Sequence, residues 1–209
     1  YIAPSLNLVQ SYEPGDKRKD NDIIYGKTTI YSGMVQTQSV IDGTTIIGAY
    51  SESDPNSVSN GYPNRFCRKG YQPRPVVGGN ENYGGNIRMM RWAEVLLIGA
   101  EAAVRTGDAK ASTWYNAVRT RAGLASKEPT LENIWEEKRI ELSMERDRYF
   151  DLVRIDKMQP GYFAAKVWAK IQSEQQGLEE MKAQGLAPAS TTLPLPPASP
   201  VVVPKNYVM

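Results

Sequence analysis

Apolar residues recur at helical spacing in the segment that follows residue 86. The recurring positions lie three or four residues apart, and they are Met90, Ala93, Leu97, Ala100 and Val104. This spacing places them on one face of an α-helix and predicts an amphipathic helix. Asn86 can cap the start of this helix, and Gly107 can end it.

A second helix is predicted directly after the first, over residues 109–123. Asp108 can cap its start and Gly123 can end it. Because the linker is about two residues, the two helices should pack antiparallel. Small residues at the contact would allow a close approach, and they are Gly99, Ala100, Ala103, Ala109 and Ala117. Such a hairpin is typical of a tetratricopeptide repeat, of which the sequence shows one unit.

Two further helices are predicted downstream. Pro129 and Thr130 begin a third helix, which we expect to continue to about Arg146. Apolar positions over residues 162–185 predict a fourth helix with a break near Gly177. The chain then becomes rich in proline, which lacks the donor that a helix needs, so this tail should be extended.

The N-terminal part of the chain has a different composition. It is rich in Gly, Asn, Ser, Pro and Tyr, and β-leaning runs over residues 28–41 and 44–50 predict a hairpin or two among loops. The predicted fold is therefore mainly α, with tetratricopeptide-like helical hairpins, long loops and a few short strands. We divide the chain into a loop-rich segment (1–86), a helical core (87–186) and an extended proline-rich tail (187–209).

Composition and charge exclude several classes of function. The 25 basic and 23 acidic residues are mixed along the chain and sum to a net charge of +2, so the basic stripe of a nucleic-acid-binding protein is absent. The sequence has no histidine and one cysteine, Cys67, which excludes histidine-based catalysis, internal disulfides and cysteine-rich zinc sites. The sequence contains no apolar run of about 18 residues, so it predicts no membrane-spanning helix. The chain begins without a signal sequence and reads like the interior of a longer protein.

The stretch EKRIELSMERDRYFDLVR, residues 137–154, combines many charges with apolar residues. On a helix Glu141 and Glu145 would lie one above the other, with Lys138 and Arg148 three positions away as cations. One interpretation is a glycosidase-like pair of carboxylates, one of which has a raised pKa. The nearby cations should instead lower both pKa values, which favours a buried structural network.

Four blocks of sequence occur in an order that resembles one known family. They are RMMRWAEVLLIGAEAAVRTGD, YNAVRTRAGL, EEKRIELSMERDRYFDLVR and PLPP. Together they resemble the C-terminal half of SusD/RagB-type outer-membrane nutrient-binding lipoproteins of Bacteroidetes. The upstream stretch PSLNLVQSYEPGDKRKD adds Tyr12, Asp16 and Arg18 to the resemblance. It implies a SusD-like α-superhelical fold, seen here as its C-terminal portion with the N-terminal half absent.

The resemblance implies a function without catalysis. Members of the family capture oligosaccharides, or in some cases peptides, and deliver them to a SusC-like TonB-dependent transporter. The implied location is the surface of the outer membrane, reached through a lipid anchor on a missing N-terminal segment, and neither a cofactor nor a metal is implied. The helical pattern leaves a tetratricopeptide-type scaffold that binds protein as an alternative, and the paired carboxylates leave a glycan hydrolase as a third.

Ligand contacts are expected near two loop-rich segments, residues 51–66 and 81–85, which carry the residue types that sugar recognition uses. The candidates are Tyr50, Asp54, Asn56, Asn60, Tyr62, Arg65, Asn82 and Tyr83. The competing interpretation is that these residues form turns and that their tyrosines cover the helical core.

Two other features have structural interpretations. Residues 16–22 and 54–61 are partial matches to calcium loops, but the second has Val58 where a ligand is needed. The tryptophans lie within predicted helical segments and are expected in the core, and they are Trp92, Trp114, Trp135 and Trp168. Sugar and peptide ligands would both use Tyr, Asn and Asp, so the sequence does not name the ligand.

Overall fold

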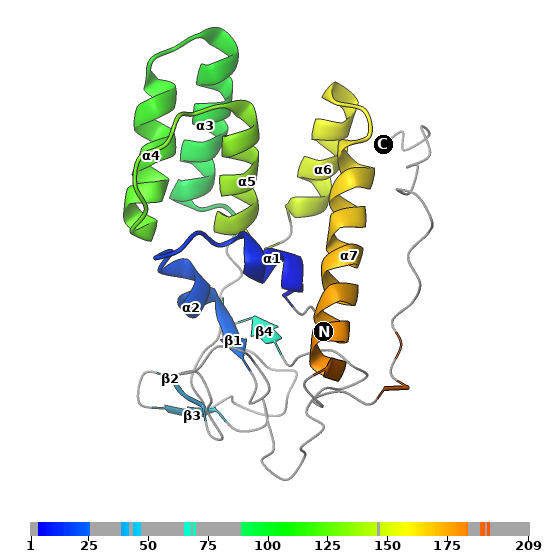
Figure 1. The fold of residues 1–209 in the computed structure, drawn as a ribbon. Helices are drawn as coiled ribbons and strands as arrows, with labels where there is room; N and C mark the ends of the chain where they lie inside the picture. Colours follow the sequence, from blue (N-terminus) through cyan, green and yellow to red (C-terminus); the bar gives the residue numbers. More distant parts are fainter. Residues whose placement is uncertain are drawn as a thin grey trace. The chain divides into compact units, whose positions relative to one another are not determined.

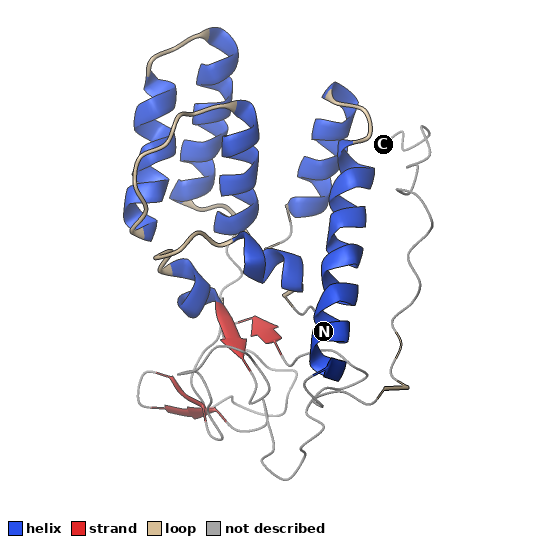
Figure 2. Cartoon of the chain, in the orientation of Figure 1, coloured by secondary structure: helices blue, strands red, loops and turns tan. Residues whose placement is uncertain are grey.

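The fold of this computed structural model is mainly α, as the sequence predicts (Figure 1; Figure 2). The structure describes residues 4–25, 39–41, 44–46, 65–67, 69, 89–145, 147–183, 189–190 and 192. Its helices in these ranges are α1 (Leu6–Ser11), α2 (Arg18–Asp22), α3 (Trp92–Thr106), α4 (Lys110–Ala122), α5 (Leu131–Glu141), α6 (Arg148–Met158) and α7 (Tyr162–Ala183). Its strands are β1 (Ile23–Tyr25), β2 (Ser39–Ile41), β3 (Thr44–Ile46) and β4 (Arg65–Cys67).

The described strands form two small sheets. β2 and β3 pair antiparallel, with Val40 opposite Thr45. This pair lies where the sequence predicts a hairpin between two β-leaning runs. β1 pairs with β4, which is far from it in the sequence.

The chain divides into two compact units, each made of segments that are distant in the sequence. Unit 1 consists of residues 1–9, 24–66 and 146–209, and unit 2 consists of residues 10–23 and 67–145. The chain therefore passes from one unit to the other at four places. The division predicted from composition stays a prediction.

Unit 2 is built around α3 and α4, with α5 packed against α3 (Figure 1). Its core consists of Ala93, Leu97 and Ala100 from α3, Tyr115 and Val118 from α4, and Ile134 from α5. These residues are nearly or fully buried because α4 and α5 turn their apolar faces toward α3. The predicted helical hairpin is confirmed.

The ends of the central helices follow local signals. α3 ends at Gly107, whose φ of 73° lies in the left-handed region that glycine tolerates best. α4 likewise ends at Gly123, with a φ of 85°. The backbone N–H of Asn133 donates to the Thr130 hydroxyl at 3.2 Å, so Thr130 caps α5, which begins at Leu131, next to the predicted start at Pro129 and Thr130.

The start of α3 differs from the prediction. The helix begins at Trp92, and residues 89–91 are not helical, so a cap at Asn86 is wrong. The backbone of Arg91 is extended, and its carbonyl accepts the first helical bonds from the amides of Glu94 and Val95. Its side chain meanwhile binds Glu141, the last residue of α5, and Glu145 in the turn that follows, which holds Arg91 outside the helix.

The third predicted helix is also shorter than expected. α5 ends at Glu141 rather than near Arg146, and a further helix, α6, was not predicted. No glycine or proline marks this break in the sequence. Met144 instead takes a φ of 61°, an uncommon conformation for a residue other than glycine. The contacts of Glu145 described below hold the chain in this turn.

In unit 1, α6 packs against α7, and the rings of Tyr149 and Phe163 meet edge to face with centroids 5.9 Å apart. α7 runs without a break through Gly177, so the predicted break is wrong. A Cβ added at Gly177 would collide with Cδ2 of Leu6. The glycine therefore provides room for α1 rather than a helix end, and Asn7 Nδ2 of α1 also donates to Ser173 Oγ at 3.2 Å.

The tryptophans do not all lie in the core. Trp135 is buried, with 5% of its surface exposed, and Trp114 and Trp168 are half-buried. Trp92 is 72% exposed, so its predicted core position is wrong. As the first residue of α3 it lies on the outer face of the helix, beside the exposed apolar residues Val95 and Ile98.

Candidate functional site

The ligand-binding residues predicted from the sequence lie almost entirely outside the described residues. These positions are Tyr50, Asp54, Asn56, Asn60, Tyr62, Asn82 and Tyr83. Arg65 is the first residue of β4, but its side chain is not among those described. The ligand site therefore stays a prediction.

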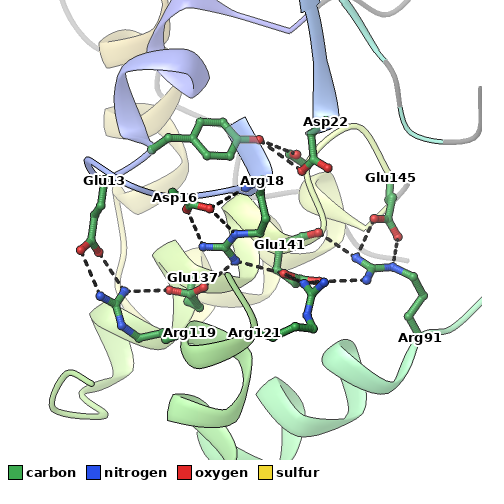
Figure 3. Close-up of polar contacts among 12 residues, drawn as sticks. Glu13, Asp16, Arg18, Asp22, Arg91, Arg119, Arg121, Glu137, Glu141 and Glu145 are labelled. Atoms are coloured by element: carbon green, nitrogen blue, oxygen red, sulfur yellow. Dashed lines mark hydrogen bonds and ion pairs between the residues drawn. The ribbon is translucent and has the colours of Figure 1, made fainter. Parts of the chain in front are cut away.

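The polar site that the structure does describe is a group of charges in unit 2 with a buried centre, which we call the charge cluster (Figure 3). Its members are Glu13, Asp16, Arg18, Asp22, Lys69, Arg91, Arg119, Arg121, Glu137, Glu141 and Glu145.

Glu137 and Glu141 lie four residues apart on α5 and therefore point from the same face of the helix. Their side chains are 2% and 1% exposed. Two carboxylates at this spacing repel each other, and burial would add a large desolvation cost. The structure offsets both effects with arginines from other segments.

Arg18 of α2 lies between the two glutamates. Its Nη1 atom is 2.6 Å from Glu137 Oε1 and 3.0 Å from Glu141 Oε2. The other side of its guanidinium binds Asp16, with Nε 2.9 Å from Oδ1 and Nη2 2.7 Å from Oδ2. The planar fork of arginine suits such paired contacts, so one side chain ties α2 to α5.

The cluster extends from this centre in two directions. On one side Arg119 of α4 joins Glu137, at 3.0 Å, to Glu13, at 2.8 Å. On the other side Arg91 joins Glu141, at 2.9 Å, to Glu145, at 2.8 Å. The exposed Arg121 also binds Glu141, at 2.6 Å.

Lys69 and Tyr12 connect Asp22 to this group. The Lys69 ammonium lies 3.4 Å from Asp22 Oδ2 and 3.1 Å from Glu145 Oε1. It also donates to the backbone carbonyl of Glu141 at 2.6 Å. The buried Tyr12 hydroxyl donates to Asp22 Oδ2 over 3.5 Å.

The arginines set the electrostatics of the glutamates. Burial alone would raise the pKa of Glu141, but hydrogen bonds from Arg91 and Arg18 and the charge of Arg121 lower it below the ordinary value of 4.5. The pKa of Glu145 is lowered in the same way, by Arg91 and Lys69 against the effect of burial. The predicted direction of both pKa shifts is confirmed, but the main contributions come from Arg18, Arg91, Arg121 and Lys69 and not from the predicted Lys138 and Arg148.

Asp22 differs from these glutamates. Burial raises the pKa of its carboxyl above the ordinary value of 3.8, and the charge and hydrogen bond of Lys69 offset that effect only in part. Burial also raises the pKa of Tyr12, which keeps its hydroxyl protonated.

The arrangement suits structure better than acid chemistry. A general acid needs a carboxyl that holds its proton near neutral pH, whereas Glu141 and Glu145 are ionised and hydrogen-bonded. Burial raises the pKa of the Cys67 thiol, which lowers its reactivity. Among the described residues, no three Cys, Asp or Glu side chains are grouped to hold a metal ion.

Sequence reasoning found the glutamates of the cluster but not its geometry. Lys138 and Arg148 were expected as cations because of their helical spacing, but α5 ends at Glu141, so Glu145 and Arg148 do not share one continuous helix. The cations that contact Glu141 come from three other segments and are Arg18, Arg91 and Arg121. No local pattern identifies such distant partners.

Comparison with known proteins places the chain in one family. Residues 2–198 match the model of the SusD family, and the chain belongs to that family. No curated protein and no solved structure matches the chain.

Family membership implies a general function. Proteins of the SusD family bind nutrients for uptake at the outer membrane, work with a transporter partner and are typically non-catalytic. Within the described parts of the chain, no helix has the length and hydropathy needed to cross a bilayer.

Proposed function

We propose that this protein captures glycans at the cell surface, without catalysis, and delivers them to a TonB-dependent outer-membrane transporter. The observation that carries the proposal is the match of residues 2–198 to the SusD family, whose members bind nutrients for outer-membrane uptake. The mainly α structure agrees with that family. We also propose that the protein is anchored by lipid outside this chain.

The charge cluster supports the non-catalytic part of the proposal. A retaining or inverting glycosidase needs one carboxyl with a raised pKa and a second carboxylate at a set distance across an open cleft. Glu141 and Glu145, the pair considered from the sequence, are instead 1% and 25% exposed, and Arg91 binds both of them. The pKa values of both carboxyls are lowered by such cations against the effect of burial. Glycan hydrolysis by this pair would require the cluster to be dismantled.

The proposed ligand contacts are the loop residues predicted from the sequence, with Tyr62 and Tyr83 as rings that stack on sugar faces. The test is isothermal titration calorimetry of the purified protein with a panel of oligosaccharides, followed by Tyr62→Ala and Tyr83→Ala. Loss of one stacking ring should weaken binding about 10-fold, equal to roughly 1.4 kcal/mol. Tyr149→Ala is the matched control because this tyrosine is 45% exposed on α6, outside the proposed loops.

The outcomes separate the proposals. Saturable glycan binding that falls in the loop variants and not in Tyr149→Ala supports the proposal. Binding of peptides and not of glycans would replace the substrate class with peptides. Release of reducing sugar from any bound glycan would contradict the non-catalytic mechanism.

A protein-binding scaffold is a second candidate, and one observation favours it. The outer face of α3 carries exposed apolar side chains, with Trp92 72%, Val95 39% and Ile98 46% exposed. Large exposed apolar residues are typical of protein-binding surfaces. Absence of both glycan and peptide binding, together with co-purification of a protein partner that Trp92→Ser abolishes, would favour the scaffold.

The proposed partner and location need a separate test in cells that make the protein. Outer-membrane fractions should contain the protein, and mild detergent extraction should recover it with a transporter. Recovery in the soluble fraction alone would contradict the lipid anchor, and recovery without a transporter would contradict delivery to one.

A further inference from the structure

The charge cluster lies close to every place where the chain passes between the two units. These passages are the peptide bonds Val9–Gln10, Ile23–Ile24, Phe66–Cys67 and Glu145–Arg146, which we call the four crossings. The unit 2 residues at these crossings are Gln10, Ile23, Cys67 and Glu145. At each of them, or within two residues of it along unit 2, the chain carries one polar side chain of this region. These side chains are Tyr12, Asp22, Lys69 and Glu145.

The same four side chains contact one another. Lys69 Nζ lies 3.4 Å from Asp22 Oδ2 and 3.1 Å from Glu145 Oε1, so it joins three of the crossings. It also donates to the carbonyl oxygen of Glu141, at 2.6 Å. Tyr12 joins the remaining crossing, Val9–Gln10, because its hydroxyl lies 3.5 Å from Asp22 Oδ2.

The chemistry of lysine explains this arrangement. An ammonium group carries three donors and no acceptor, so it can bind three acceptors at once. Here its three acceptors come from α2, from the end of α5 and from the turn after α5. The Lys69 side chain is 19% exposed, and hydrogen bonds of a charged group strengthen where water is excluded.

Tyr12 completes the contacts from the other side. Its side chain is buried, and its hydroxyl lies 3.3 Å from Ser143 Oγ in addition to Asp22. With its single proton donated to Asp22, the hydroxyl accepts from Ser143. Tyr12 thus connects the first crossing to the second and to the turn before the fourth.

We propose that Lys69 and Tyr12 form a clamp that holds the four crossings together on unit 2. Each of the four covalent connections between unit 2 and unit 1 begins close to Tyr12, Asp22, Lys69 or Glu145, the side chains that this clamp joins. Release of the clamp frees the ends of these connections while the core of α3, α4 and α5 stays folded. The four crossings therefore open as one cooperative group and not as four independent chain ends.

The test is backbone amide exchange of the whole chain, followed by mass spectrometry, in Lys69→Met. This variant removes the charge and keeps most of the stem. Exchange of the amides around the four crossings, including Glu145 N, which donates to Leu142 O at 3.1 Å, should become about 10-fold faster. Amides in the buried part of α3, such as Leu97, should keep their rates.

Lys127→Met is the matched control, because it makes the same change at an exposed site of unit 2. It should leave exchange at the four crossings unchanged. Faster exchange in Lys69→Met that spreads equally over α3 would overturn the clamp, since it would report general destabilisation. Unchanged exchange at the crossings would overturn it as well.

A second measurement applies if Lys69→Met does not fold. Tyr12→Phe deletes one oxygen, and it should accelerate exchange at the four crossings together. In the unaltered protein, amides at the four crossings should report one common opening free energy. Four unrelated values in the unaltered protein, or acceleration in Tyr12→Phe confined to residues next to Tyr12, would contradict a shared clamp.

Discussion

Replacement of Glu141 by glutamine is the most direct test of how the charge cluster stabilises unit 2. The two side chains have nearly the same shape, so Glu141→Gln removes a charge without opening a cavity. Each carboxylate oxygen of Glu141 accepts two hydrogen bonds. Oε1 binds Arg91 at 2.9 Å and Arg121 at 2.6 Å, and Oε2 binds Arg18 at 3.0 Å and Arg121 at 2.6 Å.

The magnitude follows from these contacts. A glutamine keeps one acceptor oxygen and turns its NH₂ group toward guanidinium donors, so it loses the contacts of one oxygen. A hydrogen bond to a charged group contributes about 1.5–3 kcal/mol, and removal of one member of a buried ion pair costs about 3–5 kcal/mol. We expect Glu141→Gln to lower the free energy of unfolding by about 4 kcal/mol.

Urea unfolding followed by far-UV circular dichroism and tryptophan fluorescence measures this loss as a lower transition midpoint. Glu179→Gln is the control, because its carboxylate is 70% exposed and pairs with Lys182 on the surface of α7. It should change the free energy of unfolding by less than about 0.5 kcal/mol. A loss below about 1 kcal/mol for Glu141→Gln would refute the idea that the cluster needs this charge.

Three further predictions follow from the described contacts. The free energy of unfolding should fall as the pH drops through 4.5 and below. The reason is that folding lowers the pKa values of Glu13, Glu141 and Glu145, so the folded protein binds fewer protons than the unfolded chain in this range. Urea titrations between pH 7 and pH 3 measure this change, and a free energy of unfolding that does not vary with pH would contradict it. Thr130→Ala should lower the free energy of unfolding by about 1 kcal/mol, because it removes the cap of α5. Thermal unfolding measures this loss, and a change near zero would mean that the cap bond contributes nothing to stability. Gly177→Ala should leave the free energy of unfolding unchanged in the native chain, because the new Cβ collides with Leu6. In the Leu6→Ala background, where that collision is relieved, it should raise the free energy of unfolding by about 1 kcal/mol, and a double-mutant cycle with no coupling would refute this.

Asp22 reduces the loss of stability that the three glutamates cause at low pH. Its pKa is raised in the folded protein, so it contributes stability at low pH that is lost as the pH rises through that pKa. Asp22→Asn should therefore make the fall in stability with acid steeper. The direction of this change distinguishes Asp22 from the three glutamates.

Much of the fold could be predicted because its signals are local. Helical periodicity and the glycines at positions 107 and 123 are properties of neighbouring residues, and each is found where the sequence predicts it. α5 begins at Leu131, next to the predicted start at Pro129 and Thr130. Such signals act through φ restrictions and hydrogen bonds within a few residues. They identified the hairpin of α3 and α4 and the start of α5.

The errors arose where distant contacts override local preference. The break after Glu141 has no glycine or proline, yet Met144 takes a left-handed φ while Glu145 binds Lys69 and Arg91. The glycine at position 177 looked like a helix break, but it makes room for Leu6, which lies far away in the sequence. Neither partner can be found from the residues around the site.

By itself the sequence determined the helical class, the hairpin of α3 and α4, the family, and the presence of glutamates too charged for an ordinary core. The tertiary structure alone decided which cations neutralise them. Glu141 can stay ionised in a site with 1% of its side chain exposed because Arg18, Arg91 and Arg121 converge on it from three segments. Coulomb attraction and desolvation depend on distance in space and on burial, and neither quantity is set by separation along the chain.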